Sequence, residues 1–484
     1  MKAEEIALIQ SKHNAAIIAP AGHGKTEMIT ELVDKLPGIK LVLTHTNAGV
    51  DALTKRFNKK NVNGKKYYLS TISSFCMKWT GAYPSTAGIR PGIKVTDKDF
   101  YSEVHTGTAQ IFTHSWARDI IKKTYSCVIV DEYQDCVLAQ HQIFVELNKT
   151  VPVYVLGDPL QAIFGFKESL VSWKNICFDV LEDEIDTFPW RWEKTNPALG
   201  QYLNDVRKEL LPGLEKKEVR LSTIPNQTSV FRINPADIHG SVIYDIIKKY
   251  DSVIYIAKWE TDTKAFAKSS GGIFQHDEKQ NLEALYDFAK LFDIDDVVTR
   301  GKALFDFISE CASGVPSELG SYESHIISGD YDFHRIKKHP EFGNRMTRFR
   351  ETNSYDSMLR IMEWVKACKD LRLHRRELFS EMQRSIRRAR DNQDTILKAA
   401  LEIRMIPGNQ SKYSNFKHLS SRTLLSKGLE FDCVIIDLSK VNTGWGNSNR
   451  YSVTEMYVAM TRVMKAIYFI TDQESVLLSA PQGI

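Results

Sequence analysis

The sequence predicts an α/β protein with two parallel sheets, because short apolar runs alternate with amphipathic helical stretches in two separate parts of the chain. One set of apolar runs lies within the first 160 residues, and the other lies after residue 250. The length of 484 residues is enough for about three domains. A hydrophobic share of 43% and a charged share of 26% are typical of a chain that folds, and they exclude extensive disorder.

The first sheet is predicted from four buried strands. A strand over residues 14–19, a helix over residues 26–36 and a strand over residues 40–44 have the spacing of a βαβ unit, which pairs its strands in parallel. Two further apolar strands are expected over residues 126–130 and 152–156. Ligands of open parallel sheets bind at the carboxyl ends of the strands, so we expect the chemistry there.

The second sheet is predicted from apolar runs at residues 252–257, 433–436 and 466–470. The stretch from about residue 281 to 419 is polar and helix-rich, and we interpret it as an inserted helical region. Within it, residues 372–390 form a basic helical stretch. This stretch either contacts duplex phosphates or a partner protein, or is a solvated face whose arginines pair with interspersed acids, which we favour.

Charge and cysteine content exclude several classes of protein. The net charge of +4, from 64 basic and 60 acidic residues, is too small to attract polyanions to the whole molecule, so any nucleic-acid surface must be local. The seven cysteines form no CxxC pair, which disfavours a zinc ribbon or an iron–sulfur cluster. With no signal-like N-terminus and no apolar run near ~18 residues, we expect a soluble, unprocessed cytoplasmic protein without membrane contact.

A glycine-rich segment, APAGHGKT at residues 19–26, lies between a predicted strand and a predicted helix. In this context glycines let backbone amides turn toward phosphates, and the helix N-terminus adds partial positive charge. Lys25 is expected to reach the β- and γ-phosphates, and Thr26 to offer its hydroxyl to Mg²⁺. The residues predicted to hold the nucleotide are Gly22, His23, Gly24, Lys25 and Thr26.

An acidic pair follows the predicted strand at residues 126–130. A carboxylate at the carboxyl end of a strand can hold Mg²⁺ opposite the phosphate loop, and the next residue can polarise an attacking water. We therefore assign Asp131 to the metal and Glu132 to the catalytic base. Without other motifs, an acidic pair after a strand could equally be two ordinary surface residues. The phosphate loop about a hundred residues upstream favours the catalytic interpretation.

The motifs GHGKT, DEYQD, GDPLQAIFGF, KGLEFD and YVAMTR occur in this order along the chain. Together they resemble the motifs of superfamily 1 helicases of the UvrD/Rep type. The resemblance covers both sheet-forming parts of the chain but little of the segments between the motifs. The resemblance implies two RecA-like P-loop NTPase motor domains that hydrolyse ATP with Mg²⁺, with a short insertion in the first and a helical insertion in the second. The expected first motor domain is 1–180 with its insertion at about 80–125, the second is 181–280 and 420–484, and the helical insertion is 281–419.

The resemblance also implies roles around the nucleotide. Gln161 would sense the γ-phosphate, and Arg191 and Arg462 would reach that phosphate from the second motor domain, so that closing of the two domains completes the site. Gly428 and Glu430 would bind the nucleotide, Glu430 through its sugar. Gln10 would lie near the base, although the family's glutamine lies further ahead of the phosphate loop.

Contacts to single-stranded DNA are implied for a further set of residues. Aromatic rings near Gln161 would stack on bases, a contact that does not depend on sequence, although packing in the core is the competing interpretation for both rings. Ser73 stands where the family commonly has histidine. The residues implied to contact DNA are Thr46, Asn47, Arg56, Thr71, Ser74, Phe75, Phe164 and Phe166.

The leading hypothesis for function is an ATP-dependent translocase or helicase that moves on single-stranded DNA, 3′ to 5′ as the resemblance implies. Compact chains of this type also resemble the helicase-like subunit of the Gabija anti-phage defence system. That likeness gives a second hypothesis, an NTPase that senses DNA ends and activates a partner nuclease without productive unwinding. A small-molecule kinase is disfavoured because it leaves GDPLQAIFGF, KGLEFD and YVAMTR unexplained.

Overall fold

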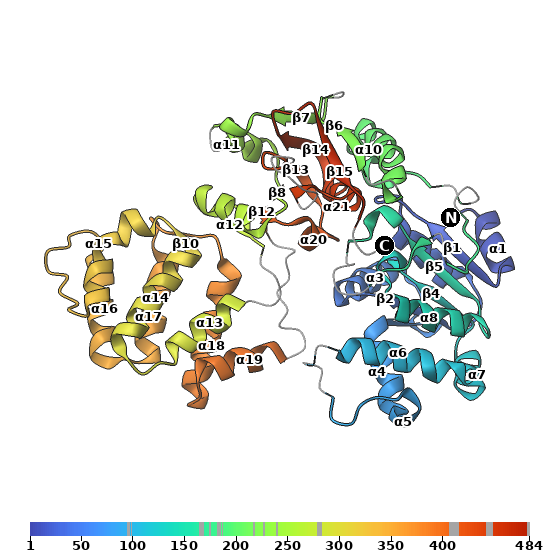
Figure 1. Cartoon of the computed structure of the whole chain (residues 1–484), viewed down its shortest axis with the longest axis horizontal. Coiled ribbons are helices and arrows are strands. Elements are labelled where there is room, and N and C mark those ends of the chain that lie inside the picture. The colour runs from blue at the N-terminus through green and yellow to red at the C-terminus, as the bar shows by residue number, and fades with distance from the viewer. Residues whose placement is uncertain are drawn as a thin grey trace. The chain divides into compact units, whose positions relative to one another are not determined.

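The chain forms two compact units (Figure 1). The first consists of Met1–Ser229, Lys440–Lys465 and Glu474–Ile484, and the second of Val230–Ser439 and Ala466–Gln473. The structure is a computed structural model, and it describes residues 1–93, 97, 99–163, 169–173, 176–181, 185, 187–215, 218–225, 228–238, 241–277, 283–405, 416–441 and 449–481.

A five-stranded parallel sheet forms the centre of the first unit. Its strands are β1 (Asn14–Ile18), β2 (Lys40–Thr44), β3 (Tyr67–Thr71), β4 (Cys127–Val130) and β5 (Val153–Gly157). They are ordered β1-β5-β4-β2-β3, and each adjacent pair is parallel. The four predicted strands are present to within one residue at each end, whereas β3 was not predicted.

Helices cover both faces of this sheet, because successive strand residues point to opposite sides. Ala15, Ile17 and Val42 face one apolar core, and Leu41 and Leu43 face the other. The first core is shared with α1 (Ala3–Ser11), α2 (Lys25–Lys35) and α3 (Asn47–Lys59). The second core is shared with α4 (Ile72–Ala82), α5 (Pro84–Ala87), α6 (Phe100–Thr113), α7 (Ser115–Thr124) and α8 (Leu138–Asn148). Burial on both faces explains why the central strands are mostly apolar.

The carboxyl ends of all five strands lie at one edge of the sheet, because the strands are parallel. β1 leads into the phosphate loop, β2 into Thr46 and β3 into Thr71. β4 leads into Asp131 and the short helix η2 (Tyr133–Asp135), and β5 leads into Asp158 and η3 (Pro159–Gln161). The fold therefore gathers most of the predicted site residues of this unit along one edge.

Three further helices complete the first unit: α9 (Trp190–Glu193), α10 (Pro197–Leu210) and α21 (Val453–Met460). Asn196 caps α10, and Ser452 with Glu455 forms a capping box on α21. The strands β6 (Glu218–Ser222) and β15 (Ser475–Ser479) pair antiparallel. Residues 181–229 and 440–465 thus group with the first sheet, whereas the sequence placed them in the second motor domain. The reason is that α9 and α21 pack against loops of the first sheet.

The second unit is built around a six-stranded sheet in the order β7-β14-β13-β8-β12-β9, to which β14 contributes most of its length. The pairs β7/β14, β13/β8, β8/β12 and β12/β9 are parallel. The strands are β7 (Val230–Ile233), β8 (Val253–Ile256), β9 (Gln275–His276), β12 (His418–Ser421), β13 (Phe431–Asp437) and β14 (Val463–Ile470). Helices α11 (Ser241–Lys249), α12 (Glu260–Ser269) and α20 (Thr423–Ser426) accompany them.

A group of helices lies between β9 and β12 in the sequence (Figure 1). It has an apolar core of its own, which includes Leu304, Phe307 and Met362. The helices are α13 (Glu283–Phe292), α14 (Val297–Cys311), α15 (Val315–Ser328), α16 (Pro340–Thr352), α17 (Tyr355–Ala367), α18 (Arg376–Asn392) and α19 (Ile396–Met405), with the short strand pair β10 (Ala312–Ser313) and β11 (Arg372–Leu373). Among the described helices, none combines the length and the apolar character of a membrane span.

The basic stretch at residues 372–390 pairs with acidic side chains of the same unit. Arg387 Nη2 lies 3.2 Å from Glu363 Oε1, and Arg390 Nη1 lies 2.9 Å from Asp356 Oδ1. Both acids belong to α17. These ion pairs favour the interpretation of α18 as a solvated helix face with paired charges.

Candidate nucleotide-hydrolysis site

The loop between β1 and α2 has the backbone geometry that phosphate binding requires. Gly22 and Gly24 have φ angles of +75° and +83°, a left-handed conformation that glycine adopts without strain. Gly24 is also the N-cap of α2, and no side chain in the described part of the chain caps this helix end. The amide groups of the first turn of α2 therefore remain for an anion, together with the partial positive charge of the helix.

The short helix α9 packs directly on this loop. The backbone N–H of Arg191 donates to the carbonyl oxygen of Gly22 at 3.1 Å. A Cβ atom at Gly22 would lie 2.6 Å from the ring of Trp192, and one at Gly24 would lie 3.2 Å from the ring of Trp190. Glycine is therefore required at Gly22 by the packing of α9 as well as by backbone conformation.

His23 lies between the two glycines, and its ring contacts α10. Its Nε2 lies 2.9 Å from Oδ1 of Asn204 on α10, and the residue is buried. Burial lowers the pKa of the His23 imidazole, so the ring is neutral at pH 7. The His23 side chain thus anchors the loop to α10 through its Nε2 atom.

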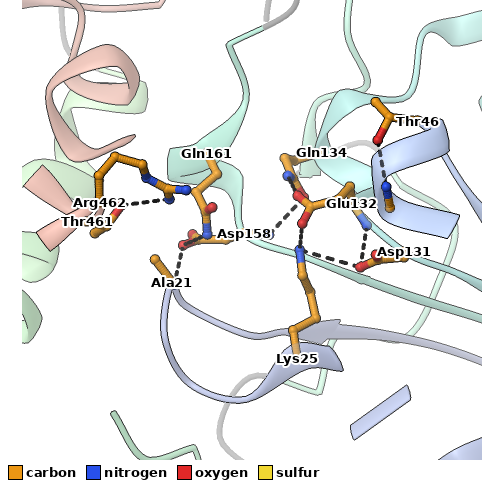
Figure 2. Close-up of polar contacts among 11 residues, drawn as sticks. Ala21, Lys25, Thr46, Asp131, Glu132, Gln134, Asp158, Gln161, Thr461 and Arg462 are labelled. Atoms are coloured by element: carbon orange, nitrogen blue, oxygen red, sulfur yellow. Dashed lines mark hydrogen bonds and ion pairs between the residues drawn. The ribbon is translucent and has the colours of Figure 1, made fainter. Parts of the chain in front are cut away.

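Asp131 and Glu132 follow β4, and both contact Lys25 (Figure 2). Lys25 Nζ forms an ion pair with Glu132 and lies 3.6 Å from Asp131 Oδ1. Gln134 Nε2 donates to the second oxygen of Glu132. The φ angle of Glu132 is +54°, which is uncommon for a residue other than glycine. The structure thus brings together the predicted base, the predicted metal ligand and the phosphate-loop lysine.

The charges of this cluster depend on one another. Burial raises the pKa of the Asp131 carboxyl above its usual range, although Lys25 opposes the change. Burial alone would lower the pKa of Lys25, but the attraction of Glu132 and Asp131 raises it above its ordinary value. Lys25 therefore stays charged at neutral pH. Burial makes the charged form of the Asp131 carboxyl costly, and a nearby cation stabilises that charged form. Asp131 is therefore suited to binding a divalent ion.

Asp158 connects several parts of the site and was not selected from the sequence. Its carboxylate is fully buried and accepts from Ala21 N at 3.2 Å and Gln161 Nε2 at 3.0 Å (Figure 2). It also accepts from Arg207 Nη2 at 3.0 Å. Its own N–H donates to Gln134 Oε1 at 3.0 Å. One signal could have found it: Asp158 follows a buried strand in the same way as Asp131. No sequence pattern pointed to Arg207.

The two arginines expected from the second motor domain group with the phosphate loop in the first unit. Arg191 Nη1 donates to the carbonyl oxygen of Thr461 at 2.5 Å. Arg462 is buried, and its Nε donates to Val458 O at 3.0 Å. Helix α21, which precedes Arg462, contacts η3, which carries Gln161. Figure 2 shows the Arg462 guanidinium near Gln161, whose side-chain amide is directed at Asp158. The location of Arg191 and Arg462 therefore differs from the expectation, since α9 and α21 pack on the first sheet.

A cavity of about 750 Å³ opens beside the phosphate loop. Trp190 and Phe188 line it, with their rings edge to face at 4.9 Å between centroids, and Trp190 is 58% exposed. An exposed ring against the phosphate loop is placed to contact a base, a role that sequence analysis did not assign to Trp190. Gln10 is exposed and is not among the lining residues. The others that line the cavity are Met1, Lys2, Glu5, His23, Gly24, Glu27, Met28, Glu31, Arg56, Lys59, Lys60, Glu193 and Lys194.

Arg56 lies with the nucleotide residues rather than with the other predicted DNA contacts. Its Nε is 2.8 Å from Oε2 of Glu27 on α2. Thr46 and Asn47 are at the other end of α3, about 15 Å away along the helix axis. A DNA contact by Arg56 stays a prediction that its position does not favour.

The threonines predicted to touch DNA begin helices at the carboxyl edge of the first sheet. Thr46 Oγ1 accepts from Gly49 N at 3.0 Å and caps α3, whose first residue is Asn47. Thr71 Oγ1 caps α4 and donates to Ser74 Oγ at 2.8 Å. Helix starts at this edge are suited to phosphate contacts, but the roles of these residues stay predictions.

The prediction for Phe75 is wrong as far as its ring is concerned. Phe75 is 3% exposed, and its ring stacks on that of Phe112 at 6.2 Å within the core beneath α4 and α6. A buried ring cannot stack on a base. Phe164 and Phe166 lie outside the described residues.

Gly428 and Glu430 belong to the second unit. Gly428 has a φ angle of +86° in the turn between α20 and β13, and both residues are exposed. Their contact with the nucleotide stays a prediction.

The residues at the edge of the first sheet fit a nucleoside triphosphate with Mg²⁺. The helix end and Lys25 offer positive charge to phosphates, and the Asp131 carboxylate and the Thr26 hydroxyl are oxygen ligands of the kind that Mg²⁺ prefers. A bound Mg²⁺ would supply further positive charge to phosphate oxygens.

Comparison with known proteins agrees with this chemistry. Residues 3–167, which include the phosphate loop, the acidic pair and Gln161, match the family model of an AAA domain. A stretch of 94 residues, 19% of the chain, is 42% identical to the RecBCD enzyme subunit RecB of Buchnera aphidicola subsp. Schizaphis graminum, of which it covers 8%. A stretch of 53 residues is 42% identical to the same subunit from Buchnera aphidicola subsp. Acyrthosiphon pisum and covers 4% of it.

The matched stretches thus span far less than two thirds of these curated relatives. Together with the AAA-domain match, they support an NTP-hydrolysing protein of the superfamily 1 helicase type.

Proposed function

We propose that the chain is an ATP-dependent translocase or helicase of the UvrD type, which moves 3′ to 5′ on single-stranded DNA. One observation carries this proposal: Lys25, Glu132 and Gln161 lie at one edge of one sheet and are joined through Asp158 and Gln134. Gln161 belongs to the segment predicted to contact DNA. On this proposal, the hydrogen bonds through Asp158 and Gln134 would link the nucleotide residues mechanically to the segment that contacts DNA.

The ion pair of Lys25 with Glu132 gives a route from substrate binding to activation of the base. When Lys25 turns to a phosphate, the Glu132 carboxylate loses its cationic partner and is able to accept a proton from water. Gln134 still holds the other oxygen of Glu132 and keeps the carboxylate oriented. Asp131 and Thr26 would hold Mg²⁺ beside it.

The second parallel sheet is proposed as the second RecA-like motor, with Gly428 and Glu430 as its contacts to the nucleotide. The helices α13 to α19 are proposed as the accessory insertion of that motor. Arg191, whose backbone contacts the phosphate loop, and Arg462, which follows α21, would stabilise negative charge that develops on the γ-phosphate.

The proposed roles of Lys25 and Glu132 are separable by experiment. Lys25→Ala removes charge that binds phosphate, so both ATP affinity and turnover should fall. Glu132→Gln removes the base but leaves Lys25, so ATP should still bind while turnover falls by about 10²–10⁴-fold. Calorimetric titration with ATP and a phosphate-release assay measure the two quantities. Lys35→Ala, at the exposed end of the same helix, is the control and should match the parent.

A second candidate is an NTPase subunit that senses DNA and activates a partner nuclease. The curated relatives are named as subunits of a larger enzyme, which favours a chain that works with partners. Strand displacement, measured beside ATPase activity with and without single-stranded DNA, distinguishes the two candidates. Stimulated ATPase with strand displacement supports the helicase, and stimulated ATPase without displacement supports the sensor. ATPase activity that DNA does not change would contradict both.

A further inference from the structure

The helical part of the second unit holds a separate group of reactive side chains that the proposed hydrolysis does not use. His339, Cys368 and Asp370 each direct one potential ligand atom into a space where the three atoms lie within 4.8 Å of one another. His339 immediately precedes α16, Cys368 immediately follows α17, and Asp370 lies two residues further on. The helix ends thus bring an imidazole, a thiol and a carboxylate together from distant parts of the sequence.

The spacing of these atoms matches that of a metal site. A tetrahedral zinc ion with bonds of ~2.0–2.3 Å separates its ligand atoms by ~3.3–3.8 Å. His339 Nε2 and Asp370 Oδ2 are already 3.7 Å apart. The sulfur of Cys368 needs to move by at most about 1 Å to reach the same geometry, which a small side-chain rotation provides.

Glu318, in the first turn of α15, lies outside this group of three but contacts its imidazole, and a rotation of the Glu318 side chain would make it a fourth ligand. Its Oε2 lies 3.0 Å from His339 Nε2 and 2.9 Å from Lys338 Nζ. A cation bound to His339 Nε2 would take the place of a proton between this atom and the Glu318 carboxylate. The Glu318 Oε2 atom already faces His339 Nε2.

We propose that His339, Cys368, Asp370 and Glu318 form a zinc site that fastens the ends of α15, α16 and α17 to one another. The combination of a thiolate and an imidazole favours Zn²⁺ over Mg²⁺ or Ca²⁺, which take oxygen ligands. The thiolate and two carboxylates supply the negative charge that the ion needs, and Cys368 releases its thiol proton to solvent on binding. The site is independent of the proposed ATPase function.

The test uses the full chain without a histidine tag, stripped of metal by a chelator and dialysed. Titration with Zn²⁺ against a chromogenic chelator should give about one tightly bound ion per chain. Co²⁺ in place of Zn²⁺ should give a sulfur-to-cobalt charge-transfer band in the near ultraviolet, because one ligand is a thiolate. Zn²⁺ should also raise the melting temperature by several degrees.

Two variants locate the site. Cys368→Ser should abolish the charge-transfer band. His339→Asn should weaken Zn²⁺ binding by ten-fold or more, and asparagine tolerates the positive φ angle of +51° found at this position. Cys177→Ser, which removes an exposed cysteine outside the cluster, is the matched control and should retain the band.

A band that persists in Cys368→Ser, or its absence from the parent chain, would overturn the proposal. If Cys368→Ser does not fold, unchanged Zn²⁺ affinity of His339→Asn would overturn it equally.

Discussion

Two buried polar side chains, one beside each parallel sheet, differ in their hydrogen bonding. Asp158, which follows β5, and His374, which lies next to β9, are both 0% exposed. The Asp158 carboxylate accepts hydrogen bonds from Ala21, Gln161 and Arg207. Neither ring nitrogen of His374 has a hydrogen-bond partner among the residues that the structure describes.

The difference shows that burial alone does not tell what a polar residue contributes. A buried carboxylate with several donors fixes the positions of the groups that donate to it. A buried imidazole without partners costs free energy and resists protonation. The edge that carries Asp158 is therefore organised for positioning, whereas His374 makes its region sensitive to acid.

The largest effect is expected from breaking the Asp158 network. Asp158→Ala leaves the Arg207 guanidinium buried without its carboxylate, so the free energy of unfolding of the first unit should fall by about 3–5 kcal/mol. ATPase activity should fall with it, because Ala21 and Gln161 lose their common partner. Denaturant unfolding and phosphate release measure the two effects.

The matched control for this change is Asp205→Ala. Asp205 pairs with Lys208 on the exposed face of the same helix as Arg207. Its loss should change stability by no more than about 0.5 kcal/mol. Equal stability of the two variants would contradict the importance given to Asp158.

A smaller effect is expected at Gly157, which precedes Asp158. A Cβ atom there would lie 2.5 Å from Gln134 Oε1 and 2.8 Å from the ring of Trp173. Gly157→Ala should therefore cost about 1–3 kcal/mol of stability. It should lower turnover more than ATP affinity, because Gln134 orients Glu132, and parallel measurements of turnover and ATP affinity test this.

Gly81→Ala is the control for the change at Gly157. Gly81 lies in α4, and a Cβ atom there would meet nothing within 4 Å. Alanine favours a helix over glycine, so this variant should be stabilised by up to about 1 kcal/mol. If Gly157→Ala also left the protein as stable as the parent or more stable, Gln134 would not be held as tightly as its contacts indicate.

The smallest effect concerns His374 and depends on pH. Burial lowers the pKa of the His374 imidazole to about 4, whereas an unfolded histidine titrates near ~6.5. The unfolded chain therefore binds more protons, and stability is lost as pH falls from about 6.5 toward 4. At pH 5 the loss from this residue is about 2 kcal/mol.

His374→Leu should remove that loss. The variant should be more stable than the parent at pH 5, and the gain should largely disappear at pH 8, as denaturant unfolding at both values will show. A variant less stable than the parent at pH 5 would mean that the imidazole is stabilised by its surroundings, and the contrast with Asp158 would fail.

The first sheet was largely predictable, because its strands are buried on both faces and read as continuous apolar runs. β3 was missed because its residues, YYLST, begin with half-buried tyrosines and end in polar residues. The phosphate loop and the acidic pair were also predictable from short motifs, since each lies within a few residues of a strand end.

Other parts of the site depend on contacts between distant segments, which no local pattern reveals. Arg207 reaches Asp158 from a helix 49 residues further along the chain. Phe75 was misinterpreted because an aromatic residue within a motif has the same one-dimensional pattern as a core residue of a helix. The group around His339 and Cys368 is not predictable from the sequence, because its members do not follow the spacing of known zinc motifs.

The position of Trp190 gives the molecule an intrinsic optical reporter. Its indole ring lines the cavity and lies against Gly24, while more than half of its surface is in contact with solvent. Indole emission shifts with the polarity of its surroundings, so a nucleotide that displaces water from this ring changes the light that the protein emits. A Trp190→Phe variant shows how much of the fluorescence change comes from this residue and how much from the other tryptophans, of which the chain has eight in all. Arrival and departure of the nucleotide can then be timed in a stopped-flow fluorimeter on the unlabelled chain.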